Sequence, residues 1–115
     1  MPTVLFIITT DPRASHRPGE AIRIAAGVGV WKRAEITVYL RESAVLALSE
    51  ETEGFVDEEN YPRYLPLLRD ASRKIYVQRG AALLPKPHES ALPFQEIDDT
   101  ELAILAAKSD YLLRF

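Results

Sequence analysis

Residues 4–40 read VLFIITTDPRASHRPGEAIRIAAGVGVWKRAEITVYL, and this stretch decides the fold. Its first part, residues 4–9, is a continuous apolar run rich in β-branched side chains, which is typical of a strand buried on both faces. A polar loop follows, and a helix with one apolar stripe is predicted over residues 18–31. Residues 35–40 are dense in β-formers and predict a second strand. Together these elements make a βαβ unit, which is almost always right-handed.

The rest of the chain continues this alternation. Three more strands are predicted, at residues 74–78, 94–98 and 111–115, with helical segments between them. Strands that alternate with helices favour a mostly parallel sheet covered on both faces. At 115 residues the chain has room for one core. We therefore predict an α/β fold, a single three-layer α/β/α domain over residues 1–115 with a mostly parallel five-stranded sheet.

The sequence also predicts the buried face of the first helix and the ends of two later helices. In the first helix the buried stripe is expected to contain Ile22, Ala25, Ala26 and Gly29, widened by Ile24 and Val28. Asn60 could cap a second helix that runs to residue 72. Pro66 would interrupt that helix, so its regular part is expected to start near Leu65. Asp98 or Asp99 is expected to cap a last helix, which runs to residue 108 and turns Leu102, Leu105 and Ala106 inward.

The composition excludes several classes of protein. A net charge of −3 gives no general attraction to nucleic acid or anionic lipid. The absence of cysteine excludes disulfides, thiolate metal sites and thiol catalysis within this chain. The apolar run at residues 4–8 is too short to span a bilayer and lacks the features of a signal peptide. We expect a cytoplasmic protein that binds neither nucleic acid nor membrane.

No metal or cofactor is predicted. The two histidines, His16 and His88, lie far apart in sequence and have no HxxxH or HxxE spacing. Neither GxGxxG nor GxxxxGK, the glycine-rich loops that hold phosphate groups, is present.

Four segments together resemble the DsrE/DsrF-like family of small α/β proteins, which includes subunits of bacterial sulfur-relay complexes. They are the opening strand VLFIITT, the helix EAIRIAA, the strand EITVYL and the closing SDYLLRF, at residues 4–10, 20–26, 35–40 and 109–115. The resemblance implies that sulfur-carrying members place a cysteine just after the strand at residues 74–78. It also implies assembly into homo-oligomers or with DsrE-like paralogues.

The position that matches this cysteine is about Gln78, and an amide cannot carry sulfane sulfur. Direct sulfur transfer by this chain is therefore excluded. The carboxyl ends of parallel strands are still where ligands gather. We expect a pocket at the strand ends near Thr10, Arg41 and Gln78. There Gln78 and Arg79 could hydrogen-bond a ligand, or Gln78 could complete the sheet while Gly80 supplies an unusual backbone angle.

The first loop is a second candidate. A polar loop that leads into a helix N-terminus favours anions, and its arginines would add positive charge. The alternative is ordinary capping with solvated charges. With the strand ends, the loop completes the candidate ligand-binding set, which is Thr10, Asp11, Arg13, His16, Arg17, Arg41, Gln78 and Arg79.

Two surfaces could meet a partner. The acid-rich stretch at residues 50–59 is either a partner-facing flap with Phe55 exposed or a solvated loop. Trp31, Tyr61 and Tyr64 could anchor a subunit interface, because large amphipathic rings are enriched there.

The leading hypothesis is a non-catalytic DsrE-like protein, which acts by homo-oligomerisation and by binding a partner protein or a small anion at the strand ends. No catalytic residue is assigned. Two alternatives remain open. One is an accessory subunit of a sulfur relay, and the other is a small enzyme in which His16 or Asp11 acts with Arg13, Arg17 and Arg79 on an anionic substrate.

Overall fold

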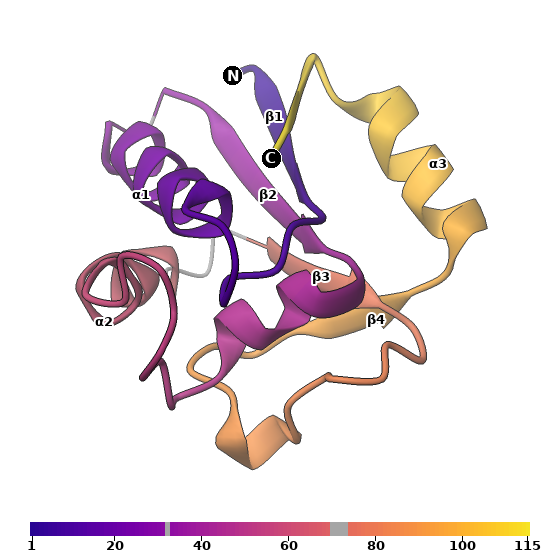
Figure 1. Ribbon diagram of the computed structural model, residues 1–115. Coiled ribbons are helices and arrows are strands. Elements are labelled where there is room, and N and C mark those ends of the chain that lie inside the picture. The colour runs from indigo at the N-terminus through magenta and orange to yellow at the C-terminus, as the bar shows by residue number, and fades with distance from the viewer. Residues whose placement is uncertain (32, 70–73) are drawn as a thin grey trace.

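The computed structural model describes residues 1–31, 33–69 and 74–115. It shows strands joined by α-helices and short 3₁₀ helices (Figure 1). In chain order the elements are β1 (Thr3–Ile8), α1 (Arg17–Val30), β2 (Glu35–Leu40), the 3₁₀ helix η1 (Glu42–Leu48), α2 (Asn60–Tyr64), the 3₁₀ helix η2 (Leu65–Arg69), β3 (Lys74–Gln78), the 3₁₀ helix η3 (Pro87–Glu89), β4 (Gln95–Ile97), α3 (Asp99–Lys108) and β5 (Tyr111–Arg114).

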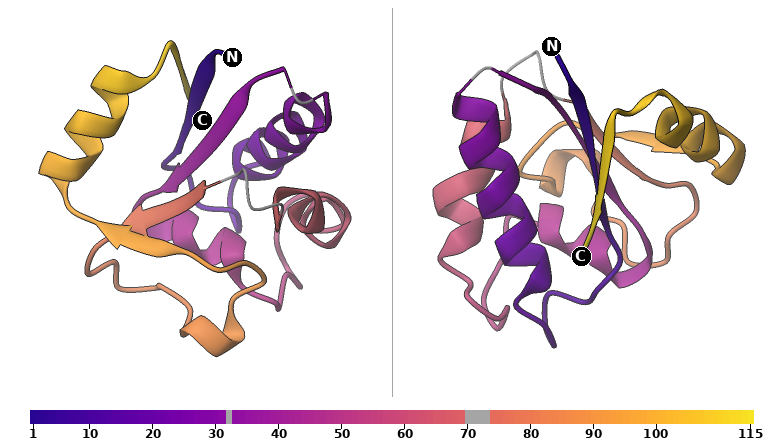
Figure 2. Two further views of the ribbon diagram at one scale, coloured as in Figure 1. Left: turned by 180° about the vertical axis from the view of Figure 1, so that it is seen from behind. Right: turned by 90° about the horizontal axis from the view of Figure 1, so that it is seen from above.

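The strands form one sheet in the order β4-β3-β2-β1-β5, and every neighbouring pair is parallel. The chain steps from β1 through β2 and β3 to β4 in one direction, and β5 then returns to the other side of β1. α1 and α2 cover one face of the sheet and α3 covers the other (Figures 1 and 2). The predicted three-layer α/β/α fold is confirmed, and the sheet is parallel throughout.

The central strands feed two separate cores because successive side chains of a strand point to opposite faces. Phe6 and Ile8 of β1 pack on the side of α1 and α2, in a large buried cluster. Leu5 and Ile7 of the same strand pack on the side of α3, in a cluster that contains two further buried residues among those described, Tyr39 and Ile97. The sheet is therefore well covered on one face and thinly covered on the other.

α1 lies close to the sheet because its inner face is made of small residues. Ala21, Ala25, Ala26 and Gly29 are buried together with Ile22, as the predicted stripe requires. The expectation that Val28 widens this stripe is wrong, because 37% of its surface is exposed. A helix this near to a sheet buries a narrow stripe, and Val28 lies beyond its edge.

The expectation for the second helix is also wrong in part. Asn60 lies inside α2, where Glu59 is the N-cap, and the regular helix precedes Leu65 instead of starting there. Pro62 is tolerated in the first turn. Pro66 has no N–H to donate back to the carbonyl of residue 62, so the chain continues from Leu65 as the 3₁₀ helix η2. The predicted end at residue 72 lies outside the described residues.

α3 begins and ends as predicted. The Asp98 side chain accepts a hydrogen bond from the N–H of Glu101 at 2.8 Å, and the Glu101 side chain accepts one from the N–H of Asp98 at 3.3 Å. This capping box satisfies two N–H groups that a helix start otherwise leaves unpaired. Neither α3 nor any other described helix is long and apolar enough to cross a membrane.

The acid-rich stretch at residues 50–59 is tied to the body of the protein. The N–H of Val56 donates to the carbonyl of Pro12 at 2.9 Å, and the ring of Phe55 meets that of Tyr61 edge to face with centroids 5.3 Å apart. Phe55 is half-buried against the main core, so it is not exposed as the predicted partner-facing flap would require. Tyr61 is fully buried and unavailable as an interface anchor, whereas Trp31 is 73% exposed.

Candidate functional site

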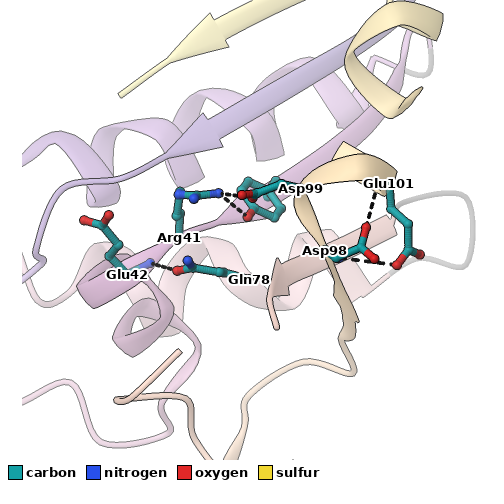
Figure 3. Close-up of polar contacts among 7 residues, drawn as sticks. Arg41, Glu42, Gln78, Asp98, Asp99 and Glu101 are labelled. Atoms are coloured by element: carbon teal, nitrogen blue, oxygen red, sulfur yellow. Dashed lines mark hydrogen bonds and ion pairs between the residues drawn. The ribbon is translucent and has the colours of Figure 1, made fainter. Parts of the chain in front are cut away.

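Parallel strands bring the predicted strand-end residues to one edge of the sheet. Arg41 directly follows β2, Gln78 is the last residue of β3, and Arg79 follows it. Asp98 and Asp99 come after β4, which lies beside β3 in the sheet (Figure 3). We call the group Arg41, Glu42, Gln78, Arg79, Asp98, Asp99 and Glu101 the strand-end cluster.

Gln78 has a structural contact at this edge. Its side-chain oxygen accepts a hydrogen bond of 2.9 Å from the backbone N–H of Glu42 (Figure 3). Glu42 has φ of 55°, a left-handed conformation that costs a residue other than glycine roughly 1–2 kcal/mol. The contact holds this turn at the start of η1. No hydrogen bond within the described ranges uses the side-chain NH₂ of Gln78, which is thus the part able to meet a ligand.

Arg41 is engaged on two sides. Its guanidinium donates to Asp99 Oδ1 at 2.7 Å and to the phenolic oxygen of Tyr39 at 3.1 Å. The bond from Arg41 lowers the pKa of the Asp99 carboxyl. Burial raises the pKa of the Tyr39 phenol, and the hydrogen bond from Arg41 acts in the opposite direction. Arg41 thus joins the end of β2 to the start of α3.

Arg79 is the more exposed cation of the cluster, with 57% of its side chain in solvent. It lies 3.3 Å from a Glu101 oxygen and 3.6 Å from an Asp98 oxygen. Gly80 has φ of 77°, so it supplies the left-handed turn expected after the strand.

The strand-end cluster is acidic overall. Glu42, Asp98, Asp99 and Glu101 contribute four carboxylates against the two guanidinium groups of Arg41 and Arg79. The carboxylates were not among the predicted site residues. Asp98 and Asp99 could be identified as helix-capping residues, but the chain order does not reveal that β4 pairs with β3.

The first loop is organised around its own residues. The Asp11 carboxylate accepts bonds from the backbone N–H of Arg13 at 2.8 Å and from its guanidinium at 2.7–3.2 Å. The bonds from the Arg13 side chain hold the pKa of Asp11 below its ordinary value. His16 is the N-cap of α1, yet its side chain makes no capping bond. The Arg17 guanidinium donates to the carbonyl of Arg114 at 3.3 Å.

The structure therefore divides the predicted ligand-binding residues into two groups. Arg41, Gln78 and Arg79 share the strand-end cluster. In the described part of the chain, no side-chain hydrogen bond or ion pair joins Asp11, Arg13, His16 or Arg17 to that cluster.

Thr10, the remaining predicted residue, lies just after β1 and directly before Asp11. Its hydroxyl oxygen is buried and, like that of Tyr61, has no hydrogen-bond partner among the described residues. Burial raises the pKa of the Tyr61 phenol, with the charges of Asp57 and Asp11 adding to the effect. These two hydroxyls are the unsatisfied buried groups that the described chain retains.

Comparison with known proteins identifies the fold. No protein-family model and no curated protein sequence matches the chain. Among solved structures, it matches the ychN protein from E. coli with a TM-score of 0.76, over 100% of both chains and with 19% sequence identity. That protein has a DsrE-like fold. The fold implied by the sequence resemblance is confirmed, and at this identity the match carries no information on activity.

Proposed function

Taking a cysteine-free chain with a DsrE-like fold as the premise, we propose that this protein is non-catalytic and acts by association. It forms homo-oligomers and binds a partner protein at the strand-end cluster. The observation that carries the proposal is the position and the hydrogen bond of Gln78. This residue stands at the strand end where the family resemblance places a sulfur-carrying cysteine, and its side-chain oxygen is engaged by the backbone of Glu42.

Charge favours a protein partner over a small anion. An anion bound to Arg79 would lie beside the Asp98 and Glu101 carboxylates, and an anion bound to Arg41 would have to displace Asp99. These carboxylates would repel the anion, and a displaced Asp99 would be left without its hydrogen-bond partner. A protein surface offers peptide carbonyls to the Gln78 NH₂ and basic side chains to the exposed carboxylates.

The accessory-subunit alternative is a special case of this proposal in which the partner carries the cysteine. The enzyme alternative finds less support. Asp11 is bonded to Arg13, and the lowered pKa of its carboxyl makes it a weaker proton acceptor at neutral pH.

The test compares two charge reversals. Arg79→Glu alters the exposed cation of the cluster. Arg23→Glu is the matched control, because Arg23 is an exposed arginine on α1 that is likewise paired with a glutamate. In affinity capture from the native host, with quantification of each co-purified protein, at least one partner should be lost with Arg79→Glu and retained with Arg23→Glu.

Two results would contradict the proposal. One is the same set of captured proteins with both variants. The other is binding of inorganic phosphate or sulfate with a Kd below about 1 mM by calorimetry, if Arg79→Glu abolishes this binding. The second result would restore the small-anion alternative. Self-association is tested separately by light scattering of the purified protein, where a monomer at all concentrations would contradict it.

A further inference from the structure

The C-terminal strand β5 exposes an apolar edge. It pairs with β1 alone, so its other side is an open edge of the sheet (Figure 2, right). Its three apolar residues are all exposed, Tyr111 by 62%, Leu112 by 37% and Leu113 by 41%. Edge strands usually carry charges, proline or a bulge that block pairing with another chain. Within β5 the first three residues have none of these.

The apolar side chains of β5 lie on both faces of the sheet. In the parallel register Tyr111 is beside Val4 and Leu113 beside Phe6, on the face of α1. Leu112 is beside Leu5, on the face of α3. A partner that covered only one face would leave the other exposed, whereas an added strand would shield both.

The backbone of β5 has hydrogen-bonding groups available at this edge. The N–H and C=O of Phe115 both bond to β1, at 2.8 Å to Ile7 and 3.0 Å to Thr9. Backbone groups of alternate residues in a strand point the same way, so Tyr111 and Leu113 also face β1. The N–H and C=O of Leu112 and the N–H of Arg114 therefore point outward and are available. The C=O of Arg114 already accepts a bond from the Arg17 guanidinium at 3.3 Å, and the N–H of Asp110 donates to the Thr3 carbonyl at 3.0 Å.

The charges that flank the strand are self-complementary. When two copies of β5 lie antiparallel about a two-fold axis at Leu112, Asp110 of each faces Arg114 of the other. Tyr111 then faces Leu113, and the two Leu112 residues face each other. Arg114 makes no ion pair with any residue in the described ranges. Asp110 uses one carboxylate oxygen on Thr3 and has a second oxygen to offer.

We infer that β5 is the self-association site, and that a second copy of this chain adds its own β5 antiparallel to form one continuous sheet across a two-fold axis. The inference rests on the self-association that is part of the proposed function, and it identifies the surface. Leu112 exchanges both backbone hydrogen bonds with its counterpart. Opposed side chains of an antiparallel pair share a face, so two Asp110–Arg114 ion pairs lie on the face of α3.

The test is a charge swap followed by sedimentation equilibrium. Arg114→Asp places Asp opposite Asp at both ends and should raise the dimer Kd about tenfold or more. Combining it with Asp110→Arg restores opposite charges and should return Kd to within about threefold of the wild type. Trp31→Ala, which removes the most exposed large aromatic side chain elsewhere, is the control and should leave Kd unchanged.

A cross-linking measurement provides an independent test that does not depend on charge. The chain has no cysteine, so Leu112→Cys introduces a single thiol that lies opposite itself, with Cα atoms about 5.5 Å apart. A short bis-maleimide should convert this variant to covalent dimer. Ala103→Cys, on the exposed side of α3, should remain uncrosslinked.

The outcomes separate the two proposals. A dimer whose Kd is unaffected by Arg114→Asp, together with no cross-link at position 112, overturns the assignment to β5 and leaves the proposed function intact. Loss of the dimer in Trp31→Ala but not in Arg114→Asp does the same. A protein that stays monomeric at several hundred micromolar, without cross-linking, overturns both.

Discussion

The two faces of the sheet differ in how far their helices are embedded. α1 buries seven of its 14 residues, whereas α3 buries none of its 10. The inward side chains of α3, among them Leu102 and Leu105, are only partly buried over a cluster of four buried residues. A groove lined by Tyr76, Ile97, Leu105 and Lys108 remains between α3 and the sheet. Apolar burial is the main source of stability, so the α1 face should hold most of it.

The largest expected loss of stability comes from a substitution on the α1 face. Phe6 is fully buried, and its ring stacks on that of Phe115 with centroids 5.9 Å apart. Phe6→Ala should lower the free energy of unfolding by about 3–5 kcal/mol, because it removes a large ring from a packed core. Urea denaturation measures this change. A loss below about 1.5 kcal/mol would show that this face is less tightly packed than the buried surface indicates.

A smaller effect is expected on the α3 face. Leu105→Ala should lower the free energy of unfolding by about 1–2 kcal/mol, since the side chain is only half-buried and the site can collapse around it. Ile104→Ala is the matched control. Ile104 is 51% exposed on the same helix, and its loss should cost under about 0.5 kcal/mol. Equal losses from Leu105→Ala and Phe6→Ala would remove the difference between the faces.

Removal of the Tyr61 hydroxyl oxygen, on the α1 face, should increase the stability of the protein. The Tyr61 hydroxyl is buried without a partner among the described residues, and such a group costs free energy. Tyr61→Phe should therefore raise the free energy of unfolding by about 1 kcal/mol, measured by urea denaturation. Tyr64→Phe, at a half-buried tyrosine of the same helix, should have no effect. Destabilisation by Tyr61→Phe would mean that the hydroxyl is satisfied in solution.

The smallest effect concerns the attachment of α3 and depends on pH. Because Arg41 lowers the pKa of Asp99 in the folded state, this carboxylate contributes stability above its unfolded pKa of about 3.9. That contribution is lost as the pH falls through the folded pKa. Asp99→Asn should be less stable than wild type at pH 7 and should converge with it in acid. Urea denaturation between pH 7 and 2.5 tests this, and parallel curves would show that the ion pair adds nothing.

Much of the fold is predictable because its signals are local. The β-branched runs at Glu35–Leu40 and Lys74–Gln78 define both strands at their observed bounds, and Asp98 caps α3 through a contact three residues away. Errors arise where tertiary packing decides. Phe55 and Tyr61 lie in or beside an acid-rich stretch, yet each packs against the other and the core. Residue type alone does not reveal that contact.

The site is less predictable because it depends on strand order. Parallel strand ends indicate that Arg41 and Gln78 share an edge, and the structure agrees. The bond from Arg41 to Asp99 spans 58 residues and requires β4 to pair with β3. Nothing within either segment encodes that pairing. The contact of Gln78 with Glu42 likewise depends on a left-handed turn at a glutamate, a residue type that rarely adopts this conformation.

The position of β5 also constrains the order of folding. β1 and β5 are neighbours in the sheet although they lie far apart in the sequence, and the contacts between Thr3 and Asp110 span 107 residues. Contacts so distant in sequence carry a large loop-closure cost and form late. The sheet can therefore assemble from β1 to β4 while one side of β1 stays unpaired. Phe115 stacks on Phe6 in the main core, so the late pairing of β5 also completes the cover of β1.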